Sequence, residues 1–189
     1  MKHILLLLPF WLIPFISHSS SQLSQTYVSS DSVFTFTKDG FTDFVVVDCD
    51  TLSARDIFWK TVDWINKTYK NPNEVLLTQV EGDYLIFMGV GPNMVHVPGL
   101  GEKIYFDIRY RITVYFKNGR YKFEVNSLEI GNQGNWSDML SNFFYYKKNG
   151  EIRNTYKDYE VSIPKYINKL NQRLRDYILN SDNSKKNDW

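Results

Sequence analysis

The feature that most constrains the fold is a strict alternation of side chains along residues 104–116. Apolar residues stand at the even positions and more polar ones at the odd: Ile104, Phe106, Ile108, Tyr110, Ile112, Val114 and Phe116 against Tyr105, Asp107, Arg109, Arg111, Thr113 and Tyr115. Because successive side chains of a strand point to opposite faces, this pattern predicts a long strand with one buried and one solvent-facing side.

Asn118-Gly119 follows this strand, and the dipeptide is the preferred two-residue turn of a right-twisted hairpin. Such a turn sets three apolar pairs on one face: Phe116 with Tyr121, Val114 with Phe123, and Ile112 with Val125. The apolar phase then shifts, which predicts a β-bulge near Asn126-Ser127.

Helices are expected on either side of this hairpin in the sequence. Ser53 and Asp56 resemble a capping box ahead of an apolar stripe, and Asn71-Pro72 would end the resulting helix over 53–70. Pro164 is expected to open a second helix over 164–180, because proline is favoured in the first helical turn.

Further strands are expected over 41–49, 75–81 and 84–90, whereas 91–103 and 131–138 are expected to be loops because they are rich in glycine or polar residues. The reading is one α+β domain over 41–180, an antiparallel sheet with one face covered by the two helices. An extended leader (22–40) and a disordered polar tail (181–189) are expected around it.

A known family shares these features. They are a hydrophobic strand (Phe44 to Val47), a helix with Phe58 and Trp64-Ile65, then Val75, a strand containing Gly89, and the hairpin Tyr115 to Phe123. Over 43–130 the chain resembles an uncharacterised domain of secreted Bacteroidetes-type proteins with a fold like that of the TATA-box-binding protein (TBP). The resemblance implies a TBP-like order β-α-β-β-β-β-α, and it implies no reaction and no functional residues. A shared fold does not imply a shared function.

The first residues predict export. Lys2 precedes an uncharged apolar run over 4–16, and small residues at Ser17, Ser19 and Ser21 follow at cleavage spacing. The run is shorter than the about 20 residues that a membrane-spanning helix needs. We therefore expect a signal peptide over 1–21 and a soluble product in the periplasm or outside the cell. It would not be a lipoprotein, because no cysteine stands immediately after the apolar run.

The net charge and the scarcity of reactive side chains exclude several classes of function. The chain holds 22 Lys and Arg against 21 Asp and Glu, a net charge of +1, which argues against nucleic acid as a partner. Of the three histidines, only His96 would remain after signal cleavage. Cys49, between Asp48 and Asp50, is expected to be buried at a strand end. We therefore expect no catalytic residue, no metal ligand and no cofactor.

Candidate contacts are consequently surface groups, namely Tyr105, Arg109 and Arg111 on the polar side of the long strand, His96 in the 91–103 loop, and the aromatics Phe143 and Tyr145. Tyrosine and arginine dominate binding hot spots. The alternatives are a solvated sheet face for the first group, a plain connection for the loop, and a core role for the aromatics. The chain is therefore expected to be an exported, non-catalytic binding or accessory domain of the bacterial envelope that recognises an envelope protein or glycan. A carboxylate-dependent envelope hydrolase is the alternative.

Overall fold

The central hairpin is present in the predicted register and is longer than expected. A computed structural model describes residues 33–132, 134–140 and 143–181. In it β6 (Lys103–Lys117) and β7 (Arg120–Asn132) are joined at Asn118-Gly119. All three predicted apolar pairs face each other, and the register shifts between Arg111 and Ile112, which face Ser127 and Val125. The shift leaves Asn126 without a partner residue and confirms the predicted bulge.

The other strands extend this hairpin into one six-stranded antiparallel sheet. Its order is β3 (Phe44–Asp48), β7, β6, β5 (Tyr84–Pro98) and β4 (Leu76–Val80), while β8 (Asn135–Asp138) also pairs with β7. β1 (Phe36–Thr37) and β2 (Gly40–Phe41) form a separate two-stranded ribbon. The expected loop over 131–138 is thus wrong in part, because residues 135–138 return along β7 as β8.

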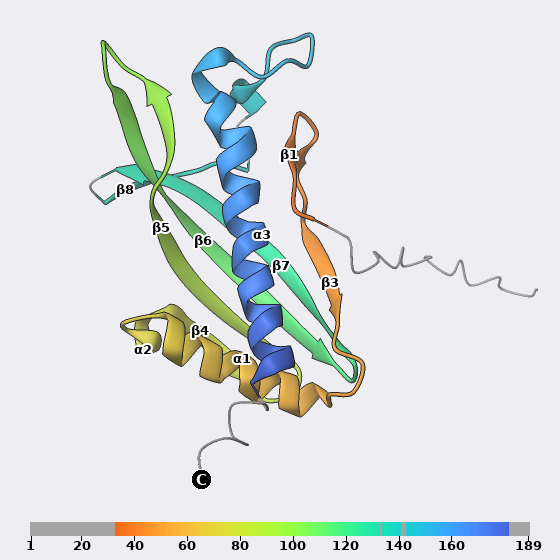
Figure 1. Ribbon diagram of the computed structural model, residues 1–189. Helices are drawn as coiled ribbons and strands as arrows, with labels where there is room; N and C mark the ends of the chain where they lie inside the picture. Colours follow the sequence, from red (N-terminus) through yellow and green to blue (C-terminus); the bar gives the residue numbers. More distant parts are fainter. Residues whose placement is uncertain (1–32, 133, 141–142, 182–189) are drawn as a thin grey trace, which may run out of the picture.

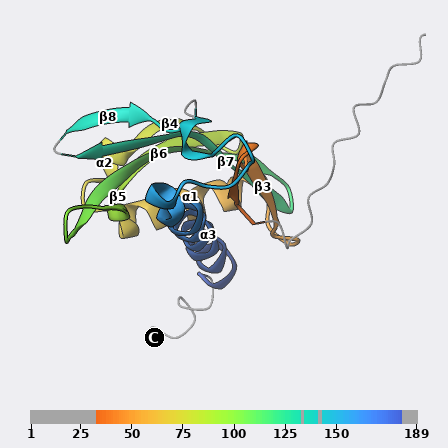
Figure 2. The same cartoon turned by 90° about the horizontal axis from the view of Figure 1, so that it is seen from above.

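Helices cover one face of this sheet, as Figures 1 and 2 show. α1 (Ala54–Thr68) and α3 (Lys157–Asn180) are long, and α2 (Pro72–Val75), η1 (Phe143–Tyr145) and η2 (Asn154–Tyr156) are short. The expected α+β class, an antiparallel sheet with two helices over one face, is therefore confirmed, and β1, β2 and β8 are additions to the expected order.

The start of α1 is confirmed and the start of α3 is corrected. The Ser53 hydroxyl accepts the Asp56 amide at 3.1 Å, and the Asp56 carboxylate accepts the Ser53 amide at 3.3 Å, which is a complete capping box. α3 begins at Lys157, so that Pro164 lies inside it. An internal proline removes one backbone hydrogen bond. Burial of Tyr159 and Ile163 ahead of Pro164 offsets that loss.

The core lies between the helices and the inner face of the sheet. Even-numbered β6 residues from Ile108 to Phe116 are buried, as are Leu85 and Phe87 of β5. The expected burial fails at Ile104, which is 46% exposed, because it pairs with Val97 near the tip of the β5–β6 hairpin, and this tip stands clear of α3 (Figures 1 and 2). We call the far end of the hairpin, residues 91–107, the arm.

The arm replaces the loop that was expected over 91–103. β5 continues to Pro98 through a register irregularity between Gly91 and Val95. Asn93 adopts a positive φ of 48°, and its amide donates to an Asp107 carboxylate oxygen at 2.8 Å. The carboxylate thus satisfies the backbone where pairing is interrupted. The turn at the tip is closed by the Gly99 amide, which donates to the Glu102 carbonyl at 2.7 Å.

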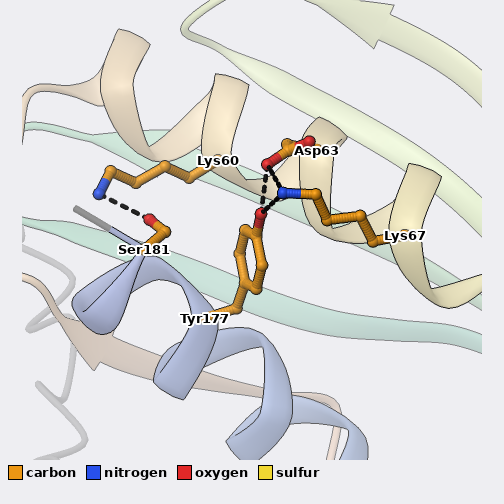
Figure 3. Close-up of polar contacts among 5 residues, drawn as sticks. All are labelled: Lys60, Asp63, Lys67, Tyr177 and Ser181. Atoms are coloured by element: carbon orange, nitrogen blue, oxygen red, sulfur yellow. Dashed lines mark hydrogen bonds and ion pairs between the residues drawn. The ribbon is translucent and has the colours of Figure 1, made fainter. Parts of the chain in front are cut away.

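Polar contacts join the two long helices where they cross, as Figure 3 shows. The Lys67 ammonium lies 2.8 Å from an Asp63 carboxylate oxygen and 2.6 Å from the Tyr177 hydroxyl, which also donates to Asp63. Lys60 donates to the Ser181 hydroxyl at 2.9 Å. The Lys67, Asp63 and Tyr177 contacts are exposed and add little stability, because surface ion pairs contribute little, whereas the Lys60 contact is partly buried.

The ends of the chain are described only in part. Of the expected leader, residues 33–40 are described, and they place Phe34 and Phe36 in the core. The expected signal peptide over 1–21, the expected leader up to residue 32 and the expected tail beyond Ser181 lie outside the described residues.

Alkaline pH is expected to destabilise this core. Burial raises the pKa of the Cys49 thiol to about 11 and that of the Tyr145 phenol to about 12, and it also raises the pKa of Tyr69, Tyr110 and Tyr121. The usual values are 9.0 for cysteine and 10.0 for tyrosine. Because the folded state holds these protons more tightly, their stabilising contribution is complete below pH 9 and is lost as the pH rises through the raised values.

Urea unfolding at pH 7, 9, 10 and 11 measures this effect. The midpoint should stay level between pH 7 and 9 with respect to these groups and should fall at pH 10 and 11. A midpoint at pH 11 equal to that at pH 7 would show that folding does not raise the pKa values of these groups.

Candidate binding surface

The face of the sheet opposite α1 and α3 carries no helix in the described part of the chain (Figure 2). We call it the open face. The register assigns its side chains, because residues directly across from each other share a face. It holds Phe44 and Val46 of β3, Lys122 and Glu124 of β7, Arg109, Arg111, Thr113 and Tyr115 of β6, Tyr84, Ile86, Met88 and Val90 of β5, and Thr78 and Val80 of β4.

On the open face, the first half of β5, residues 84–90, is apolar. Tyr84, Ile86, Met88 and Val90 alternate with the inner residues of β5, and we call these four side chains the β5 stripe. Val90 is 44% exposed and the other three are half-buried. Val80, across from Tyr84 on β4, extends the stripe sideways and is 40% exposed.

Sequence reasoning missed this stripe, although the signal was present. Residues 84–90 read YLIFMGV, without a charged residue on either face. In an antiparallel sheet, a strand that faces water on one side normally alternates apolar and polar residues. A run that is apolar on both sides is typical of strands that are covered on both sides.

Charges on the strands beside the stripe are mostly paired. Arg109 donates to a Glu129 carboxylate oxygen at 2.5 Å, and its guanidinium lies 4.6 Å from the centre of the Trp136 ring. Lys122 pairs with Glu124, and its ammonium lies 4.2 Å from the centre of the Tyr115 ring. Two aromatic faces of this surface are therefore occupied by cations of the chain itself.

Arg111 differs from these residues. Its side chain is exposed, it lies directly across from Met88 in the middle of the stripe, and the described part of the chain gives it no ion pair. The predicted contact residues Arg109 and Arg111 thus share the open face, but only Arg111 has its charge available.

The predicted residues His96 and Tyr105 lie together on the arm, apart from Arg111. Their rings are 5.6 Å apart. His96 Nδ1 lies 2.8 Å from an Asp158 carboxylate oxygen, which also accepts the His96 amide at 2.8 Å. Ser162 donates to the other oxygen of Asp158 at 2.8 Å. The hydroxyl bonds the carboxylate and not the imidazole, so the cluster joins the arm to α3 rather than activating a nucleophile.

The predicted aromatic patch is corrected at Tyr145. This residue is 3% exposed and packs against Tyr156 and Tyr159, with ring centres 5.1 and 5.6 Å away, so it belongs to the core. Phe144 beside it is half exposed. Phe143 belongs to η1, and its side chain lies outside what the structure describes.

Cys49 is buried, as expected, between the exposed residues Asp48 and Asp50. Burial raises the pKa of its thiol to about 11, so little thiolate exists at neutral pH. Within the described ranges, no three or more His, Cys, Asp and Glu side chains are grouped so as to hold a metal ion. Among the described helices, none is both long and apolar enough to span a membrane.

Comparisons with known proteins agree with this architecture. Residues 44–130 match the model of DUF4468, a domain of unknown function with a TBP-like fold. No curated protein matches the chain. A DUF4468 family protein from Bacteroides ovatus superposes with a TM-score of 0.60 at 9% identity, over 74% of this chain and 86% of that one.

A TBP-like protein from Parabacteroides distasonis superposes with a TM-score of 0.53 at 15% identity, over 72% of this chain and 91% of that one. Identities this low carry the fold alone. The expected resemblance is nevertheless confirmed in both the family and the fold. Residues 44–130 thus match the DUF4468 family, and the described chain has the TBP-like fold of that family.

Proposed function

We propose that this chain is an exported binding domain of the bacterial envelope and that it binds a partner protein through the open face. The observation that carries the proposal is the β5 stripe, an apolar row on a sheet face that no described helix of the chain covers. Apolar patches rimmed by polar residues mark interaction sites. The export signal expected over 1–21 supports the envelope as the place of action.

A protein partner fits the open face better than a glycan does. Sugars stack on open aromatic faces, but Arg109 lies over Trp136 and Lys122 lies over Tyr115. Nucleic acid fits poorly too, because Glu129 and Glu124 neutralise these same cations and leave no excess of positive charge for phosphates. A partner with apolar side chains can use the stripe directly.

The alternative hydrolase finds less support. General acid catalysis at neutral pH requires a carboxyl group whose pKa is raised. The carboxyl groups with shifted values move the other way: hydrogen bonds from Ser53 lower the pKa of Asp56, and Lys147 lowers that of Glu151. Both groups are also fully exposed.

Site-directed photocrosslinking tests the proposal. Val90→Cys places a thiol on the stripe, and Val161→Cys places one on the exposed side of α3, where Val161 is 64% exposed. Both variants are labelled with a benzophenone maleimide and irradiated with an envelope extract of the native cells. Cys49 should stay unlabelled, because it is buried and its pKa is raised to about 11.

The Val90→Cys probe should capture a discrete protein. Excess unlabelled protein should compete for it, and excess Met88→Glu protein should not, because a carboxylate placed in the stripe opposes apolar contact. The Val161→Cys probe should capture nothing that is competed in this way. Equal capture from both positions, or none from Val90→Cys, would refute the use of the open face.

A further inference from the structure

We infer that the element which docks on the β5 stripe is an amphipathic α-helix of the partner with a carboxylate that faces Arg111. This inference rests on the proposed function, since it specifies what the open face binds. Three properties of the surface lead to it, namely the width of the apolar area, its length, and the charge beside it.

The width of the apolar area fits one helix. Apart from Thr78, the open-face residues of β4 and of the 84–90 part of β5 are apolar. β6 beside them carries Arg109 and Arg111, the buried Thr113, and Tyr115, which lies across from Tyr84 and whose ring Lys122 covers. Neighbouring strands lie about 4.8 Å apart, so a ribbon of two strands is about 10 Å wide. An α-helix with its side chains is about 10 Å in diameter. A partner sheet would need apolar contacts across β6 and β7 as well.

A second copy of this chain, stacked open face to open face, is disfavoured for the same reason. It would bury the Arg109–Glu129 and Lys122–Glu124 pairs of both copies. Taking paired charges out of water costs more than their attraction returns unless further hydrogen bonds form. A single helix along β5 leaves these pairs at its rim, in contact with solvent.

Strand addition along the arm is disfavoured by features of its edge. Pro92 and Pro98 lack amide hydrogens, the pairing is irregular between Gly91 and Val95, and Asp158 already accepts the His96 amide that points away from β6. Prolines, bulges and charges are the usual means by which proteins block an exposed sheet edge. The arm therefore does not invite a partner strand, which leaves the face as the docking surface.

The length of the stripe sets the length of the helix. From Tyr84 to Val90 the strand advances about 20 Å at about 3.3 Å per residue. A helix that covers this distance has about 13 residues at 1.5 Å each. We expect apolar partner residues at i, i+3 or i+4, and i+7, because these positions share one helix face.

Charge complementarity supplies the carboxylate. Arg111 lies across from Met88 and has no ion pair within the described ranges. A helix seated on the stripe would lie beside this guanidinium, and a partner Asp or Glu at the edge of its apolar face would neutralise it. Such complementarity raises specificity and association rate.

The crosslinks themselves distinguish a helix from an extended segment. Ile86→Cys and Val90→Cys place labels four residues apart on one face of β5, about 13 Å along the strand. On a helical partner the two captured positions should differ by about nine residues, and on an extended partner by about four. Mass spectrometry of the crosslinked peptides reads this spacing directly.

Charge reversal tests whether a partner carboxylate faces Arg111, with the intact captured protein as the ligand. Arg111→Glu should weaken the binding of the captured protein at least tenfold. Replacing the partner's facing acidic residue by arginine should recover most of that loss. Lys117→Glu is the matched control, an exposed cation on the same strand near the turn, and it should change the affinity less than threefold. Thermal unfolding checks that each variant is folded.

Each outcome of these experiments supports or refutes either the proposed function or the helical partner. No capture at Val90→Cys refutes the proposed function and this inference together. Capture with a spacing of about four residues, or of a second copy of this chain, refutes the helix while the open face remains a binding surface. Capture with helical spacing and no effect of Arg111→Glu removes the carboxylate from the inference and thereby overturns it.

Discussion

Replacing Ile112 by alanine is expected to lower the free energy of unfolding by about 2–5 kcal/mol, whereas Arg111→Ala should change it by at most about 0.5 kcal/mol. The two residues are neighbours on β6 and point to opposite faces. Ile112 has no exposed surface and lies between Phe87 and Val125 on the adjacent strands. Its truncation leaves a cavity that close-packed neighbours fill only partly. Arg111 is exposed, so its truncation leaves no buried cavity.

Denaturant unfolding of the three proteins measures both values. Ile112→Val is the graded control, because it removes one methylene and should lower the stability by about 0.5–1.5 kcal/mol. Equal losses for Ile112→Ala and Arg111→Ala would mean that both sides of β6 are buried, for example in a stable dimer through the open face.

Local signals predicted the middle of the sheet. Alternation along 104–116 and the Asn118-Gly119 turn fixed the register of β6 and β7, because side-chain period and turn type leave a single way to pair the two strands. The bulge at Asn126 followed from the shift in apolar phase. The capping box at Ser53 and Asp56 is likewise a contact between residues close in sequence. In each case all the interacting partners lie within a few residues or on one hairpin.

The arm and the start of α3 depend on partners distant in sequence. Pro92 and the glycines around it indicate a loop, but the Asp107 carboxylate bonds the Asn93 amide and lets the pairing resume beyond the interruption. Asp158, far along the chain, then ties His96 to α3. Burial of Tyr159 stabilises the turns of α3 that precede Pro164. Tertiary contacts override the local preferences at these positions.

The candidate surface was half predicted. Arg109 and Arg111 do share a solvent-facing side of the sheet, as alternation along β6 required. The β5 stripe was missed because residues 84–90 were interpreted only as a strand, without assigning its two faces. The apolar residues on its second face can be recognised as a surface row only when the strand register shows that this face points to solvent. Tyr145 was misplaced since an aromatic run alone does not say which rings pack inward.

Gly89→Ala tests the closest approach in the core, and it is expected to destabilise the protein, whereas glycine-to-alanine in a strand usually stabilises. Gly89 lies directly across from Tyr110, and a Cβ there would stand 2.4 Å from the phenol oxygen and 2.5 Å from the adjoining ring carbon. The ring cannot move freely, because it is fully buried and its hydroxyl lies 2.9 Å from that of Tyr69 at the end of α1.

The expected loss in unfolding free energy is about 1–3 kcal/mol for overpacking, and about 1–3 kcal/mol more if the bond between the phenols breaks. A double-mutant cycle isolates the cause. In a Tyr110→Ala background the ring is gone, so that Gly89→Ala should cost nothing or stabilise by about 0.5–1 kcal/mol, the ordinary benefit of alanine over glycine in a strand. The same loss in both backgrounds would show that Tyr110 is not the reason for the glycine. A loss confined to the wild-type background would establish that Gly89 holds open the space through which Tyr110 links the sheet to α1.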